Sequence, residues 1–141
     1  MIYFKILEEK RLVVMVFKGV ITPADVMDFI DSLLQLDAFD PEYSDIIDLR
    51  SADMSYDYDG LRSTLHFMAT TKGFAAKRKS AYITSNSKQV VPPMLMKSGA
   101  FDLPMEVEVM STVESCLEWL DITGFTPADY EEILKELQVE V

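Results

Sequence analysis

The sequence predicts an α/β domain in which an N-terminal β-hairpin is followed by alternating strands and helices. Three observations support this prediction. Two β-branched runs flank a charged turn near the N-terminus, short apolar segments then alternate with amphipathic ones, and a Thr-Pro-Ala-Asp helix start occurs at residues 22–25 and 126–129. Strands that alternate with helices usually pair in parallel through right-handed crossovers. We therefore expect one mixed, mostly parallel sheet of about five strands covered by helices, with an extra C-terminal helix.

The N-terminal part of the chain predicts the hairpin and the first helix. Residues 2–7 and 12–21 are apolar and flank a charged turn, which is typical of a β-hairpin. Thr22 can cap backbone N–H groups, Pro23 suits the first helical position, and Asp25 favours the positive end of the helix dipole. The apolar residues that follow share one helical face. They are Val26, Phe29, Ile30, Leu33 and Leu34.

The middle of the chain predicts two further strand–helix units. Residues 45–49 form a short apolar strand with Arg50 at its exit, and a helix is expected over about 59–70. The fourth strand is expected at 80–85, where turn-forming polar residues end it. Proline inside a helix removes a backbone hydrogen bond, so the third helix is expected over 92–98, starting at its two prolines.

The last third of the chain predicts a fifth strand and two helices. The strand is expected at 105–110 and the fourth helix at 112–121. A final helix begins at the second Thr-Pro-Ala-Asp, and its apolar stripe consists of Tyr130, Ile133, Leu134 and Leu137. Such a stripe either covers the sheet of its own chain or mediates homodimerisation. We expect a single domain, 1–141, in which 122–141 is a C-terminal helical extension.

Composition and charge exclude some classes of function. The net charge is −11 and the isoelectric point about 4.4, so the chain repels phosphate backbones and anionic membrane surfaces. Nucleic-acid binding is therefore not expected. No apolar run approaches the ~20 residues of a membrane span, so membrane insertion is not expected, and the N-terminus has no signal-peptide pattern. The single cysteine, Cys116, cannot form an internal disulfide, which fits a reducing, cytoplasmic compartment.

Four stretches carry a resemblance to a known family: GVITPAD at 19–25, IIDLR at 46–50, AYITSN at 81–86 and ESCLEWL at 114–120. In this order and spacing they resemble the SpoIIAA-like family of the STAS superfamily, over roughly residues 2–121. The resemblance implies a SpoIIAA-like fold, related to the STAS and CRAL-TRIO folds. It also implies a regulatory module that binds a protein partner.

One motif of the related anti-sigma-factor antagonists can be placed on this sequence. In those proteins a serine at the start of the second helix, within Asp-Ser-Ser/Thr-Gly-Leu, is phosphorylated. The corresponding run here is 57–61, Asp-Tyr-Asp-Gly-Leu, which has Asp59 in place of the phosphorylated hydroxyl. Asp59 either imitates part of the charge of a phosphoserine or acts as an ordinary helix N-cap.

The polar residues that follow the third and fourth strands form the predicted binding site. Because the carboxyl ends of parallel strands meet at one edge of a sheet, these residues are expected to line a single rim. Serines and helix N-termini there suit a small anion or a loop of a protein partner. The candidate residues are Arg50, Ser55, Asp57, Asp59, Ser85, Asn86 and Ser87.

No catalytic constellation is visible in the sequence. His66, the only histidine, lies off the apolar stripe of its helix with no nucleophile in view, and Cys116 lies on a buried helical face. The acidic loop containing Asp53, Asp57 and Asp59 lacks a defined ligand spacing, so a solvated turn is expected there and not a metal site. We expect neither enzymatic activity nor a metal ion or other cofactor.

Two further groups of residues suggest contacts. A basic run is expected at the amino end of the fourth strand, either as a charged connection that guards the strand or as a contact for an acidic partner; it consists of Lys72, Lys77, Arg78 and Lys79. Methionines gather in the last third of the chain, and methionine adapts to irregular shapes. Met94, Met96 and Phe101 are therefore candidates for an apolar groove.

The sequence thus leaves three functions open. The first is a non-enzymatic binding or regulatory module that docks a protein partner through the rim after the third and fourth strands. The alternative is a carrier of a small apolar or lipid-like ligand, which the methionine cluster and the fold-level likeness to the CRAL-TRIO lipid-binding core favour. The third is a homodimer held by the C-terminal helix.

Overall fold

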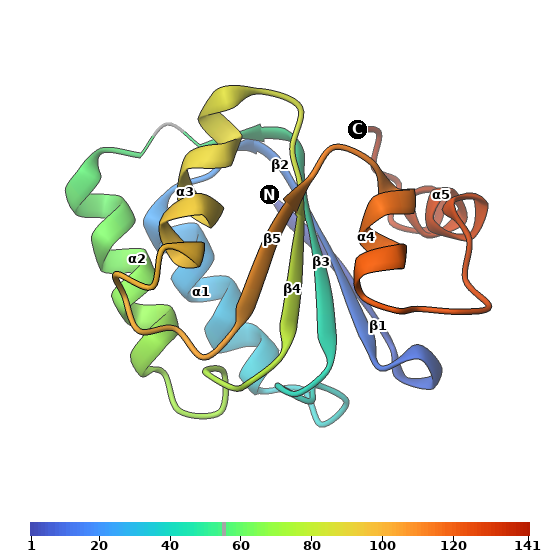
Figure 1. Ribbon diagram of the computed structural model, residues 1–141, viewed down its shortest axis with the longest axis horizontal. Coiled ribbons are helices and arrows are strands. Elements are labelled where there is room, and N and C mark those ends of the chain that lie inside the picture. Colours follow the sequence, from blue (N-terminus) through green and yellow to red (C-terminus); the bar gives the residue numbers. More distant parts are fainter. Residues whose placement is uncertain (55) are drawn as a thin grey trace.

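The computed structural model describes residues 1–54 and 56–141 and contains one five-stranded sheet with helices on both faces (Figure 1). The strands are β1 (Ile2–Leu7), β2 (Leu12–Val20), β3 (Ser44–Asp53), β4 (Lys79–Ile83) and β5 (Glu106–Met110). The helices are α1 (Pro23–Leu34), α2 (Tyr58–Thr70), α3 (Ser87–Lys97), α4 (Val113–Trp119) and α5 (Pro127–Glu136), with a short 3-10 helix at Glu8–Lys10.

The strands lie in the sheet in their chain order. β1 pairs with β2 in the antiparallel sense, and every later neighbour pair is parallel. Each parallel connection moves one strand in the same direction, so crossovers of one hand place α1, α2 and α3 on the same face. The remaining helices, α4 and α5, follow the last strand and cover the opposite face (Figure 1). The predicted mixed, mostly parallel sheet is confirmed.

Alternating side chains of the central strands contribute to two apolar cores, one on each face of the sheet. In β2, Met15 and Phe17 face α1, α2 and α3, whereas Val14 and Val16 face α4 and α5. A strand covered on both faces has a nearly continuous apolar sequence. This is why residues 12–17 form an uninterrupted apolar run.

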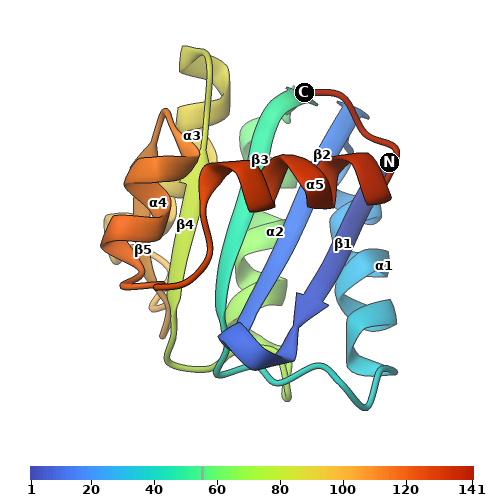
Figure 2. The ribbon, with the colours of Figure 1, turned by 90° about the vertical axis from the view of Figure 1, so that its right-hand side faces the viewer.

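The C-terminal helix is part of this domain. Tyr130, Ile133 and Leu134 are each 4% exposed or less and pack against side chains of β2, β3 and β4. α5 crosses the sheet in front of β2 and β3 (Figure 2). Of the two alternatives for its apolar stripe, the structure shows the one in which the stripe covers its own sheet. Homodimerisation itself stays a prediction.

Two boundaries differ most from the sequence prediction, whereas the others agree to within about two residues. β3 extends to Asp53 because its pairing with β2 continues past a register shift, so Arg50 lies inside the strand and not at its exit. α3 starts at Ser87 and not at Pro92, because the Asn86 side chain caps the helix by accepting a hydrogen bond from the Gln89 N–H at 3.1 Å. The two prolines lie within α3, where the expected exclusion of proline from helix interiors is overridden.

Candidate functional site

The carboxyl ends of β2, β3, β4 and β5 and the amino ends of α2, α3 and α4 meet at one end of the molecule, which we call the rim (upper edge of Figure 1). This arrangement follows from the topology, because each parallel strand leaves the sheet at the same end and the next helix starts there. The rim is therefore the place where the predicted site residues can be compared with the structure. Ser55 lies outside the residues that the structure describes.

The start of α2 is built by Asp57. Its side chain accepts a hydrogen bond from the Gly60 N–H at 2.7 Å and is the N-cap of the helix. Asp59 is the second residue of α2, so an N-cap role for Asp59 is wrong. Its carboxylate is exposed and has no hydrogen-bonding or charged partner among the described residues. The first turn of a helix favours negative charge, so Asp59 presents a free carboxylate at a positive helix end.

The start of α3 is held to β3 by a residue that the sequence analysis missed. Gln89 is 2% exposed, and its side-chain amide donates to the carbonyl oxygens of Ala52 at 3.1 Å and Arg50 at 3.3 Å. The same side chain accepts from the Ser85 backbone N–H at 2.7 Å. Ser85 and the cap residue Asn86 therefore have structural partners, although both are exposed. The available signal for Gln89 was its position three residues after a capping asparagine.

Arg50 is directed away from these residues. It lies two positions after Asp48 on the α5 face of β3, and its guanidinium donates to both carboxylate oxygens of Asp48, at 3.0 and 2.7 Å. The Tyr130 hydroxyl donates to the same carboxylate at 2.8 Å. Burial and the Asp48 carboxylate raise the pKa of Tyr130, which keeps its hydroxyl protonated as a donor. The half-buried Arg50 thus belongs to a polar cluster, centred on buried Asp48, that ties β3 to α5.

Exposed apolar side chains are concentrated at the rim. Of the seven large hydrophobic residues that are exposed in the described chain, five lie at this end: Met1, Val20, Tyr58, Val91 and Val141. Both termini reach it, because the Met1 ammonium donates to the Lys18 carbonyl at 2.7 Å and the Ser51 hydroxyl donates to the Glu140 carbonyl at 3.4 Å. Met94 lies further along α3, and Leu36 lies at the opposite end, just after α1.

Two surface grooves flank the first turns of α2. The α2–α3 groove has a volume of about 480 Å³ and is lined by Met54, Tyr56, Asp57, Leu61, Lys88, Val91 and Pro92. The second, which we call the α2 groove, has a volume of about 810 Å³ and is lined by Tyr58, Asp59, Arg62, Ser63, His66, Leu95, Ala100, Phe101 and Asp102. The structure thus brings Asp59 and Phe101, two residues singled out separately in the sequence, to one surface depression.

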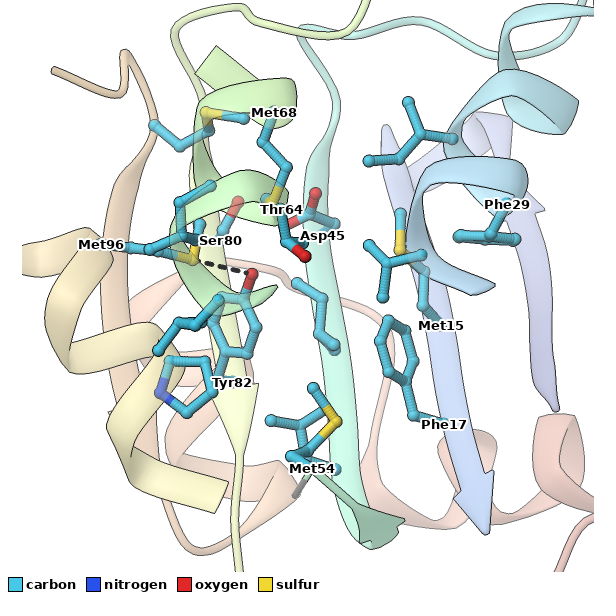
Figure 3. Close-up of a pocket in the computed structure, with 18 of the residues that line it drawn as sticks. Met15, Phe17, Phe29, Asp45, Met54, Thr64, Met68, Ser80, Tyr82 and Met96 are labelled. Atoms are coloured by element: carbon cyan, nitrogen blue, oxygen red, sulfur yellow. Dashed lines mark hydrogen bonds between the residues drawn. The ribbon is translucent and has the colours of Figure 1, made fainter. Parts of the chain in front are cut away.

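An apolar cavity of about 60 Å³ lies between the sheet and the three helices α1, α2 and α3 (Figure 3). Met96 lines it, whereas Met94 is 46% exposed on the surface of α3 and Phe101 lies in the α2 groove. The predicted apolar groove of these three residues is therefore not a single site. Met94 and Met96 are two residues apart on α3 and so point to different faces of the helix, and Phe101 lies in the turn after it.

The predicted basic run is divided in the same way. Lys72 and Lys77 are exposed, but Arg78 is 7% exposed and its Nε donates to Asp45 Oδ2 at 3.0 Å. The Lys79 ammonium lies 5.0 Å from the centre of the Trp119 ring. A continuous basic patch at this end of β4 is therefore wrong, because Arg78, just before the strand, is buried and pairs with Asp45 of β3.

Comparison with solved structures identifies the fold. An uncharacterised protein of the DUF3478 family from Shewanella loihica PV-4, described as having a SpoIIAA-like fold, superposes with a TM-score of 0.54 and 19% sequence identity. The match covers 84% of this chain and 93% of that protein. This chain has a SpoIIAA-like fold. No protein-family model matches the sequence, and comparison with curated proteins gives no significant match.

The SpoIIAA-like fold presents few reactive groups in the part of the chain that the structure describes. His66 is exposed on α2, and burial raises the pKa of the Cys116 thiol to about 12. Within residues 1–54 and 56–141, no three histidine, cysteine or carboxylate side chains come together as metal ligands. No helix in these ranges is long and apolar enough to cross a membrane.

Proposed function

We propose that this SpoIIAA-like domain is a non-enzymatic binding module that docks a protein partner on its rim. The observation that carries the proposal is the concentration of exposed apolar side chains there, five of the seven in the described chain. Exposed apolar side chains that are scattered singly need no explanation, but a group at one end of a domain is typical of an interaction surface. The α2–α3 groove and the α2 groove, on either side of the α2 N-terminus, form depressions in that surface.

The charge of the domain indicates the chemistry of the partner. The chain carries a net charge of −11, and Asp59 presents its carboxylate beside exposed Tyr58. A partner that combines apolar side chains with lysine or arginine complements both features, and opposite charge speeds its approach. The apolar contacts supply most of the affinity, since a few central side chains usually dominate an interface.

Site-specific crosslinking tests the proposal and identifies the partner. A photoreactive amino acid is introduced at Val91, on the rim, and separately at Leu36, which is 40% exposed at the opposite end of the sheet. Leu36 is the matched control because it is also apolar, exposed and outside the core. Both proteins are irradiated in cells, and the crosslinked species are identified by mass spectrometry.

We expect a defined partner to be crosslinked from Val91 and not from Leu36. The purified partner should then bind the unmodified domain, and its binding should weaken as salt is raised, since the charges are exposed. Equal crosslinking from both positions contradicts rim docking, as does a purified partner whose binding survives replacement of the rim residues.

The apolar cavity favours a second function, the carrier of a small apolar ligand. The cavity is lined by side chains of α1, α2, α3 and the sheet, and it includes Met96 from the methionine cluster. Small-molecule sites are typically concave and apolar, with few polar groups that fix orientation. Asp45, the carboxylate that lines this cavity, indicates which polar group such a ligand carries.

A further inference from the structure

The cavity and the α2–α3 groove are neighbouring spaces. Four residues line both of them: Met54, Tyr56, Leu61 and Pro92. Among the described residues, these four side chains lie between the rim surface and the interior space beside the sheet. A ligand that enters from the rim therefore passes this group first and meets the wall of β3 and β4 afterwards.

That inner wall contains one unsatisfied acceptor. Asp45 is 3% exposed and lines the cavity together with Thr64, Ser80 and Tyr82 (Figure 3). Its Oδ2 accepts from Arg78, but its Oδ1 accepts no hydrogen bond from any residue that the structure describes. Buried polar atoms without a partner are rare, because losing hydration without replacement is unfavourable.

Several of the surrounding donors are already engaged. Arg78 Nη1 donates to the carbonyl oxygens of Pro41 and Phe74 at 3.0 and 2.7 Å. The Tyr82 hydroxyl contacts the Met96 sulfur at 3.3 Å.

Two shorter hydroxyls complete this wall. Thr64 donates to the Gly60 carbonyl at 2.9 Å. The Ser80 hydroxyl is close enough to lower the pKa of Asp45, but it forms no hydrogen bond of normal geometry with Oδ1. Burial outweighs it and raises the pKa of Asp45. The free oxygen of Asp45 is thus available to a donor from outside the chain.

We propose that the cavity binds the hydroxyl end of an aliphatic alcohol, with the hydroxyl donating to Asp45 Oδ1 and the apolar chain extending past Met54 and Pro92 into the α2–α3 groove. This inference rests on the second function above.

The electrostatics of the pocket favour an uncharged donor. Arg78 already balances the charge of Asp45, so a ligand ammonium brings an uncompensated positive charge into a buried site. A ligand carboxylate has no proton to donate and is repelled by Asp45. A hydroxyl supplies one donor and no charge, which matches one free acceptor oxygen.

The size and lining of the pocket favour a narrow chain. A cavity of about 60 Å³ is well below the ~150 Å³ that accommodates a benzene ring in a protein core. Five methionines line the space, and methionine side chains adapt their shape to a guest. They are Met15, Met54, Met68, Met96 and Met105.

The methyl groups of these methionines also report ligand binding by NMR. The protein is labelled with ¹³C at the methionine methyl groups and titrated with n-hexanol or with methyl pentyl ether. The two probes are isomers, so they match in size and composition, but only the alcohol donates a hydrogen bond. We expect saturable shifts of the cavity methionines with n-hexanol and no shift of exposed Met1 and Met94. A hydrogen bond to a buried carboxylate corresponds to about tenfold or more tighter binding of the alcohol.

Two variants assign the effect to Asp45. In Asp45→Asn, Arg78 Nε requires the amide oxygen, so the amide NH₂ faces the cavity, where it donates to alcohol and ether alike. The preference for the alcohol should then disappear. Tyr82→Phe is the control, because it removes a cavity hydroxyl and leaves Asp45 unchanged, and the preference should persist. If Asp45→Asn does not fold, the comparison of the isomers on the wild-type protein still decides the question.

The outcomes distinguish failure of the alcohol-binding inference from failure of the carrier function on which it rests. Equal affinity for alcohol and ether overturns the role of Asp45 and leaves the apolar carrier standing. Absence of cavity shifts with either probe overturns both. Stronger binding of hexanoate than of n-hexanol also overturns the inference, because it shows a ligand with its head at the rim and not at Asp45.

Discussion

Gly60 shows how closely the start of α2 is packed against its neighbours. A Cβ atom at this position would lie 2.9 Å from Asp57 Oδ1 and 3.0 Å from Pro23 Cγ. The Asp57 oxygen is the one that caps the helix, and Pro23 is a rigid ring at the start of α1. The glycine of the Asp-Tyr-Asp-Gly-Leu run is thus required by the space around a helix cap.

Replacement of Gly60 by alanine should destabilise the protein. In an open helix the same change stabilises by about 1 kcal/mol. Here the added methyl group displaces the Asp57 cap or Pro23, and loss of a cap costs about 1 kcal/mol or more. We expect a lower free energy of unfolding in urea, by about 1 kcal/mol, whereas Ser63→Ala on the exposed face of α2 changes it by less than about 0.5 kcal/mol. A stabilised Gly60→Ala variant contradicts this account of the cap.

The Tyr130 hydroxyl should contribute measurably to stability. It donates at 2.8 Å to Asp48, which is fully buried, so Tyr130→Phe leaves a buried carboxylate with one donor fewer. A loss of about 1–3 kcal/mol is expected from thermal or urea unfolding. Tyr58→Phe is the matched control, since Tyr58 is 63% exposed and forms no hydrogen bond with the described residues. Equal effects of the two changes contradict the prediction.

Single residues were the least predictable level of this structure. Arg50, Asp48 and Asp45 are all polar residues in one apolar strand, and the buried partners of the two aspartates come from distant parts of the chain, Tyr130 for Asp48 and Arg78 for Asp45. The sequence shows the strand but not which distant residues pack against it, so the partners of these residues could not be assigned. Gln89 was missed for a similar reason, because its role depends on an α3 that begins at Ser87.

At the scale of elements, the caps of the two Thr-Pro-Ala-Asp helix starts were predicted correctly. The Thr22 and Thr126 side chains each accept from the backbone N–H three residues later, and in both helices the Asp at that position bonds back. These local interactions depend only on neighbouring residues, so the sequence contains them in full. The start of α3 depends on competition between the Asn86 cap and the two internal prolines, and the more distant contacts of Gln89 decide it.

Removal of α5 should unfold the domain and not merely alter its mass. Its side chains Tyr130, Ile133 and Leu134 are buried in the core of the α4–α5 face, and each such side chain contributes about 1.5–3 kcal/mol. Together they approach the ~5–15 kcal/mol by which a small domain is stable. Deletion of residues 126–141 should abolish the cooperative thermal transition in circular dichroism.

Deletion of Val141 alone is the control and should leave the transition nearly unchanged, because this residue is 43% exposed. Light scattering is recorded on the same samples. A shortened protein that stays folded and loses half its mass would show that α5 holds a dimer, contrary to the packing described above.

At the scale of the whole molecule, the fold and the location of the rim followed from the sequence. Alternating strand and helix patterns determine a parallel sheet, and a parallel sheet determines where its loops meet. The apolar character of the rim did not follow. Tyr58 and Val91 are ordinary helix residues in the sequence, and only the packed structure shows that no described element covers them.

Rim docking is the central claim, and the affinity of the crosslinked partner tests it most directly. The dissociation constant is measured by calorimetry for the wild-type domain, for Tyr58→Ser/Val91→Ser and for Leu36→Ser, none of which alters the charge. The account predicts about tenfold or more weaker binding for the rim variant, equivalent to about 1.4 kcal/mol or more, and an unchanged constant for Leu36→Ser. An unchanged affinity of the rim variant, or an equal loss in Leu36→Ser, would contradict it.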